Sequence, residues 1–219
     1  MPVERITMAT SPELNGFTSD VRIYFAELAT NNSKVFFDEN RGRYEHLVKQ
    51  PLELFLAAAE PIYGPGKVLR PNRDVRFSAN KDPYRTDAAM MAGTIAGVYL
   101  NLNAERIEVG GGLYGPSRDQ LDRARTLLSQ RPAVAGELDA ILTQLETAGF
   151  DVAGPSLKTA PKGFDPAHPA IRLLRLQHYA ALRRLPIDVD PTEVLESWSR
   201  ISPLNAWVDK HVGPALSRR

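Results

Sequence analysis

The sequence predicts an α+β fold: helices packed on an antiparallel β-sheet, with a helical N-terminal segment and a helical C-terminus. Two observations carry this prediction. Apolar residues recur at helical spacing before residue 63 and again after residue 117. Between these regions, the apolar segments 94–102 and 106–112 are separated only by the short stretch Asn-Ala-Glu, which is typical of a β-hairpin.

Three helices are expected in the first half of the chain. The segments 18–32 and 31–50 each carry apolar side chains at a spacing of three or four residues. Pro51 suits the first turn of a third helix, 51–62, better than the middle of a long one. The sequence Tyr-Gly-Pro-Gly at 63–66 then ends the helical region.

The middle of the chain reads as β-structure. Residues 67–77 are a predicted strand interrupted at Pro71, and therefore an edge or bulged strand. Residues 94–102 are apolar on both faces, as a central strand covered by helices would be. Residues 106–112 follow as the antiparallel partner of that strand.

Helices resume over 117–149, again with one apolar face on each. Residues 154–169 are rich in proline and glycine and are expected to be irregular but ordered. The segment 170–182 reads as a helix or a helix-to-strand passage, and its pattern does not decide between them. Residues 190–212 are expected to close the chain as a helix that starts anew near Pro203.

Length and composition indicate one domain over 1–219, with a poorly ordered N-terminal tail at 1–15. The formal net charge is only +1, which disfavours nucleic acid and membrane surfaces as partners. Cysteine is absent, which excludes disulfides, zinc-thiolate sites and cysteine nucleophiles. Because the sequence shows neither a signal peptide nor a long apolar span, we expect a cytoplasmic protein. It does not predict an oligomeric state.

The segment 70–86, RPNRDVRFSANKDPYRT, concentrates four arginines and a lysine. If 73–77 is a strand, Arg73 shares a face with Val75 and Phe77, and no carboxylate nearby in sequence lies on that face. These cations could be structural, paired with helix carboxylates, or they could form an anion pocket. On residue types alone the structural interpretation is favoured.

Two further segments support the anion pocket. The glycine-rich run 110–117 precedes a predicted helix. Glycines let the backbone approach a ligand closely, and the N-terminus of a helix favours anions. A tight turn would explain each single glycine as well. The proline-rich segment 154–169 offers Lys158, Lys162 and His168. His168 could instead cap the following helix. No established catalytic or nucleotide-binding motif is present, and we expect neither a metal nor a cofactor.

Four stretches in this order, 31–51, 73–86, 110–125 and 157–176, resemble the DUF2461 family of bacterial and fungal proteins. The similarity runs from about residue 16 to the C-terminus. One departure is Phe36-Phe37, where the family usually has tryptophan followed by phenylalanine. The resemblance implies the domain and the positions of its motifs, and it implies no activity.

We therefore expect a small anionic ligand, bearing phosphate or carboxylate, with or without associated chemistry; whether the protein is an enzyme stays open. The alternative is a non-enzymatic structural or protein-interaction module whose basic residues form internal salt bridges. His168 is the candidate for proton transfer near neutral pH if catalysis occurs. The expected ligand-binding residues are Arg73, Arg76, Lys81, Tyr84, Arg85, Gly112, Tyr114, Arg125, Lys158 and Lys162.

Overall fold

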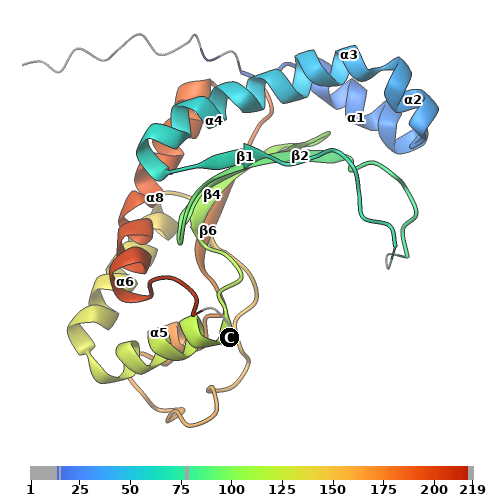
Figure 1. The fold of residues 1–219 in the computed structure, drawn as a ribbon. Helices are drawn as coiled ribbons and strands as arrows, with labels where there is room; N and C mark the ends of the chain where they lie inside the picture. Colours follow the sequence, from blue (N-terminus) through green and yellow to red (C-terminus); the bar gives the residue numbers. More distant parts are fainter. Residues whose placement is uncertain (1–13, 15, 77–78, 217–219) are drawn as a thin grey trace, which may run out of the picture.

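A strongly curved antiparallel sheet organises the protein, with helices on its convex side (Figure 1). The computed structural model describes residues 14, 16–76 and 79–216, so most of the predicted tail at 1–15 lies outside the described residues. The six strands have the order β1-β2-β3-β4-β6-β5, and every neighbouring pair is antiparallel. The α+β class is thereby confirmed. The whole molecule is bent like the letter C, with an arm at each end of the sheet (Figure 1).

The N-terminal arm is helical, as predicted. Its elements are α1 (Asp20–Thr30), α2 (Lys34–Glu39), α3 (Arg41–Tyr44), a π-helical turn (Glu45–Lys49) and α4 (Gln50–Tyr63). Pro51 lies in the first turn of α4, as predicted, although α3, the π turn and α4 follow one another without interruption. Proline lacks an N–H and collides with the carbonyl one turn back, and the wider π turn before Pro51 gives that carbonyl room.

The predicted hairpin is confirmed as β3 (Gly97–Asn103) and β4 (Ile107–Leu113), with Leu100 opposite Val109. The other strands are β1 (Gly66–Val68), β2 (Asp87–Gly93), β5 (Asp151–Val152) and β6 (Tyr179–Leu185). The sequence pattern did not reveal β2, whose residues DAAMMAG include no β-branched or aromatic side chain.

The expectation that β3 is covered by helices on both faces is wrong. Val98, Leu100 and Leu102 point into the core under the helices. Tyr99 alternates to the other face and is only partly buried. Figure 1 shows α4 and α8 on the convex side of the sheet and no helix along the concave side of β1–β3.

The predicted strand 67–77 is also wrong beyond its first residues. Strand β1 lies at the edge of the sheet, as expected, but it ends at Val68. The described residues 70–76 and 79–86 form a loop, closed by hydrogen bonds from Arg73 N to Pro83 O and from Arg85 N to Pro71 O, both 2.8 Å. Pro71 has no N–H for a sheet ladder, which explains why the strand stops. Phe77, expected to share a face with Arg73, lies outside the described residues.

The C-terminal arm contains α5 (Arg118–Gln130), α6 (Pro132–Thr147) and α7 (Ile171–Leu174). The segment 154–169 contains no helix or strand, which confirms its predicted irregularity. The undecided segment 170–182 resolves into the short helix α7 followed by the first half of β6.

The long helix α8 (Pro191–His211) joins the two halves of the core. Trp198 is buried with the N-terminal helices, and Trp207 is buried with α5 and α6. The predicted new start near Pro203 is wrong, since the helix runs through that residue. Burial of α8 along most of its length offsets the roughly 3 kcal/mol that an internal proline costs.

Among the helices of the described residues, none combines the length and apolar character that crossing a membrane requires.

Candidate functional site

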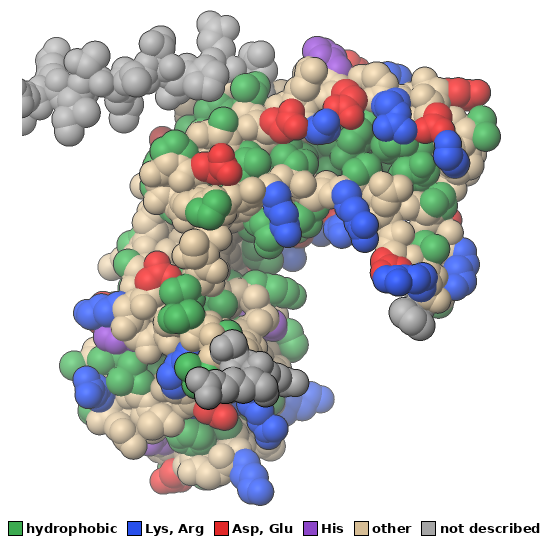
Figure 2. Space-filling model, viewed as in Figure 1, with side chains coloured by type: hydrophobic (Ala, Val, Ile, Leu, Met, Phe, Trp, Pro, Cys, Tyr) green, Lys and Arg blue, Asp and Glu red, His purple; other side chains and the backbone are tan. Residues whose placement is uncertain are grey.

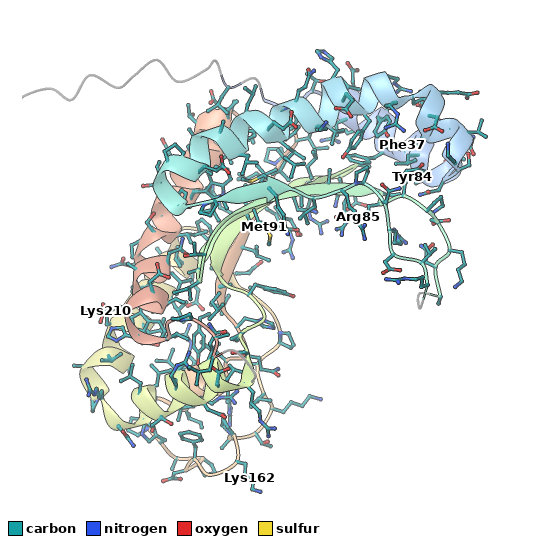
Figure 3. All side chains as sticks on the ribbon, viewed as in Figure 1. Phe37, Tyr84, Arg85, Met91, Lys162 and Lys210 are labelled. Atoms are coloured by element: carbon teal, nitrogen blue, oxygen red, sulfur yellow. The ribbon has the colours of Figure 1, made fainter. Side chains whose placement is uncertain are left out.

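The predicted binding residues do not converge on one site. Figure 3 shows Arg85 on the concave side of the sheet near the N-terminal arm, and Lys162 at the far tip of the C-terminal arm. The cations of the loop 70–86 and those of the segment 154–169 are therefore separated by the whole opening of the C (Figure 3). Each group has to be considered by itself.

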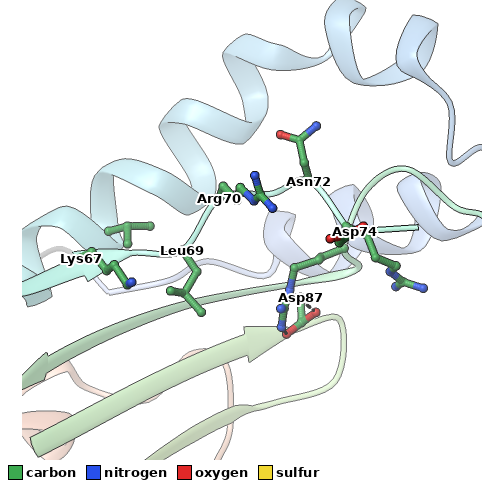
Figure 4. Close-up of a pocket in the computed structure, with 9 residues that line it drawn as sticks. Lys67, Leu69, Arg70, Asn72, Asp74 and Asp87 are labelled. Carbon is green, nitrogen blue, oxygen red and sulfur yellow. Dashed lines mark hydrogen bonds and ion pairs between the residues drawn. The ribbon is translucent and has the colours of Figure 1, made fainter. Parts of the chain in front are cut away.

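A pocket of about 780 Å³ lies between the edge strand and the loop 70–86 (Figure 4). Most of its lining is polar or charged, with two aliphatic side chains between the charges. The lining residues are Lys67, Val68, Leu69, Arg70, Asn72, Arg73, Asp74, Arg85 and Asp87. In the space-filling view, Lys and Arg side chains follow the edge of the hollow below the N-terminal arm (Figure 2).

Both carboxylates of this pocket are already neutralised. Arg76 holds Asp74 through two hydrogen bonds, from Nε at 3.0 Å and from a terminal nitrogen at 2.7 Å. These bonds keep the pKa of Asp74 below its usual value. Arg85 holds Asp87 in the same two-pronged way, at 3.2 and 2.6 Å, and Asn101 donates a further bond of 2.7 Å to Asp87.

Three cations of the pocket remain without such a partner. Within residues 14, 16–76 and 79–216, none of the ion pairs involves Lys67, Arg70 or Arg73. Lys67 and Arg70 are exposed and Arg73 is partly buried. Because the two carboxylates are balanced by Arg76 and Arg85, these three side chains give the pocket an excess of positive charge.

Lys67 and Arg70 were not among the predicted binding residues. Arg70 begins the basic segment and could have been included on its position alone. Lys67 lies three residues before this segment, and its place on the edge strand beside the pocket follows from the structure.

Two predicted binding residues of the loop 70–86 have structural contacts. Tyr84 is only 6% exposed, and its ring stacks on Phe37 with centroids 4.0 Å apart (Figure 3). Its backbone N–H and C=O are both held by the side chain of Asn32. Lys81 donates to the carbonyl oxygen of Val75 at 3.1 Å and thereby closes the loop tip. Tyr84 thus belongs to the core rather than to the pocket wall.

The residues predicted on the C-terminal arm have mostly structural contacts as well. Arg125 donates to the carbonyl oxygens of Leu174 and Leu176, at 3.0 and 3.2 Å, where α7 ends. Lys158 and Lys162 are exposed on the segment 154–169. No group of three His, Asp or Glu side chains that could hold a metal ion occurs within the described part of the chain.

Both ring nitrogens of His168 are engaged by the backbone. Nδ1 accepts a hydrogen bond from the N–H of Ala170 at 3.0 Å, just before α7. Nε2 lies 3.1 Å from the carbonyl oxygen of Ser129 and donates to it in that tautomer. His168 therefore holds the turn before α7, and both of its ring nitrogens have backbone partners in this arrangement.

The glycine-rich run shapes the sheet. Gly112 has φ +105° on β4, and an added Cβ would collide with the carbonyl oxygen of Tyr179 on β6. The N-terminus of α5 is satisfied by a capping box between Ser117 and Gln120. Tyr114 is 67% exposed and stacks on His178 at 4.4 Å.

Gly112→Ala is expected to lower the free energy of unfolding by about 2–3 kcal/mol, because it combines backbone strain with a clash against a neighbouring strand. Gly136→Ala is the matched control, since Gly136 lies inside α6 with open space where its Cβ would be. That control is expected to gain up to about 1 kcal/mol of stability. Urea denaturation of both variants measures the difference, and equal stabilities would contradict the structural role of Gly112.

The comparison with protein families gives one finding. A family model described as "Conserved hypothetical protein (DUF2461)" matches residues 21–207. No curated protein matches the chain.

Proposed function

Since the chain belongs to the DUF2461 family, whose description specifies no ligand, we propose from the pocket itself that the protein binds a small anion. The ligand carries a phosphate or a carboxylate and lies between β1 and the loop 70–86. The observation that carries this proposal is the group Lys67, Arg70 and Arg73, which line one pocket and make no ion pair within the described residues.

The chemistry of the three side chains suits such a ligand. A guanidinium presents two parallel N–H donors that match the oxygens of a carboxylate or phosphate, and a lysine adds a mobile point charge. Asn72 lies among them and offers neutral donors. Both carboxylates of the lining are held by arginines, so the charge that remains in the pocket supports binding of an anion.

The alternative function, a structural or protein-interaction module, is favoured by the contacts of two other arginines. Arg76 and Arg85, both predicted to bind the ligand, are paired with Asp74 and Asp87. For these two residues the internal salt-bridge interpretation is the better one. The two functions differ in their prediction for the unpaired cations Lys67, Arg70 and Arg73. If the pocket is the functional site, these side chains bind an anion; in a structural or protein-interaction module they do not.

A thermal-shift measurement tests the proposal. Sodium phosphate and the sodium salts of small carboxylic acids are compared with sodium chloride at constant ionic strength, which keeps the screening of surface charges equal. An anion at 100 times its dissociation constant should add about 2.7 kcal/mol to the stability of the folded protein. Arg70→Met should reduce the shift. If phosphate, carboxylates and chloride all gave the same melting temperature, the anion pocket would be ruled out and the module favoured.

A further inference from the structure

The concave face of the sheet carries a second, apolar groove beside the cationic pocket. Its volume is about 540 Å³, and it is lined by residues from β2, β3, β4 and β6 together with Tyr114. Met91 is 43% exposed there, although it is a large apolar side chain in the middle of a strand. Figure 3 shows Met91 and Arg85 on the same, concave side of the sheet.

The strand register joins the groove to the pocket. Lys67, which lines the pocket, lies opposite Met91, which lines the groove. Met91 in turn lies opposite Tyr99 on β3. Since neighbouring strands are about 4.8 Å apart, Lys67 on β1 and Tyr99 on β3 are separated by only about 10 Å across the sheet. A small molecule can therefore reach both.

The floor of the groove is unusually bare. Gly97 lies opposite Gly112, and Gly112 lies opposite Ala180, so three adjacent strands present almost no side chain along this row. Tyr114 borders the floor, and one face of its ring is stacked on His178. Backbone without side chains gives a flat surface, and an exposed tyrosine ring is a stacking partner for a flat ligand.

We propose that the ligand is an organic anion whose phosphate or carboxylate is attached to an aromatic ring. The anionic group lies among Lys67, Arg70 and Arg73, and the ring covers Met91 on its way to the bare floor. This inference rests on the anion pocket proposed above and adds the chemical class of the ligand. Its basis is the contiguity of an uncompensated cationic pocket with an apolar groove of suitable size.

Isothermal titration with matched pairs of probes tests the ligand class. Phenyl phosphate is compared with methyl phosphate, and phenylacetate with acetate, which distinguishes the two anionic groups. For at least one pair, the aromatic member should bind about tenfold more tightly to the wild type, because the ring removes apolar surface from water. The variant Met91→Gln should reduce this ratio to about threefold or less while leaving the affinity for the non-aromatic member unchanged.

A matched control comes from the other side of the molecule. Ile62 on α4 is 73% exposed and lines neither cavity, so Ile62→Gln should keep the wild-type ratio. Thermal melts without ligand show that each variant is folded. If the anions bound with equal affinity with and without the ring, or if the ratio survived in Met91→Gln, the aromatic ligand class would be refuted and the anion pocket would stand. If no probe bound the wild type, both proposals would fail.

Discussion

Replacing Tyr84 by alanine is expected to lower the free energy of unfolding by about 3–5 kcal/mol, the usual cost of deleting a buried aromatic ring. The ring is 6% exposed and stacks almost parallel to Phe37, with an angle of 6° between the planes. It holds the loop 70–86 against α2, so its removal leaves a cavity between the loop and the N-terminal arm. Urea denaturation followed by circular dichroism measures the loss.

Tyr84→Phe is the control, because it keeps the ring and removes only the hydroxyl. We expect its stability to stay within about 1 kcal/mol of the wild type and its affinity for phosphate to be unchanged. The same variant tests the original prediction that Tyr84 contacts the ligand. A clear loss of anion binding in Tyr84→Phe would show that the hydroxyl of Tyr84 contacts the ligand, in addition to the packing of its ring in the core.

Replacing Arg73 by methionine is expected to weaken phosphate binding by about tenfold to a hundredfold, as the loss of a hydrogen bond between charged groups would do. The stability of the protein should stay the same or rise slightly. Methionine preserves the packing of the partly buried stem, and the substitution removes a positive charge that has no ion-pair partner within the described residues. Titration calorimetry gives the affinity, and denaturation midpoints give the stability.

Lys162→Met removes a positive charge from the opposite arm and should leave phosphate binding unchanged (Figure 3). This control separates a local contact from a general effect of net charge. The decisive contrary result would be a loss of about 3–5 kcal/mol in Arg73→Met, which is the cost of leaving a buried carboxylate without its partner. In that case Arg73 holds the fold together, and the anion pocket should be abandoned.

Much of the fold could be predicted because its signals are local. The amphipathic helices α5 and α6 follow from side-chain spacing alone, and the hairpin of β3 and β4 follows from two apolar runs with a short turn between them. Predictions failed where tertiary packing overrides local preference. Pro203 lies inside a continuous helix, which is buried along most of its length.

The sequence alone predicts that positive charge gathers in residues 70–86. It could not determine which cations share a pocket. Lys67 lines the pocket from β1 without belonging to the basic segment, whereas the segment that carries Lys158 and Lys162 lies on the other arm. The physical reason is that the path of the loop, and not the order of residues along it, decides which side chains face one cavity. Only the curvature of the sheet and the register of its strands decide which side chains meet.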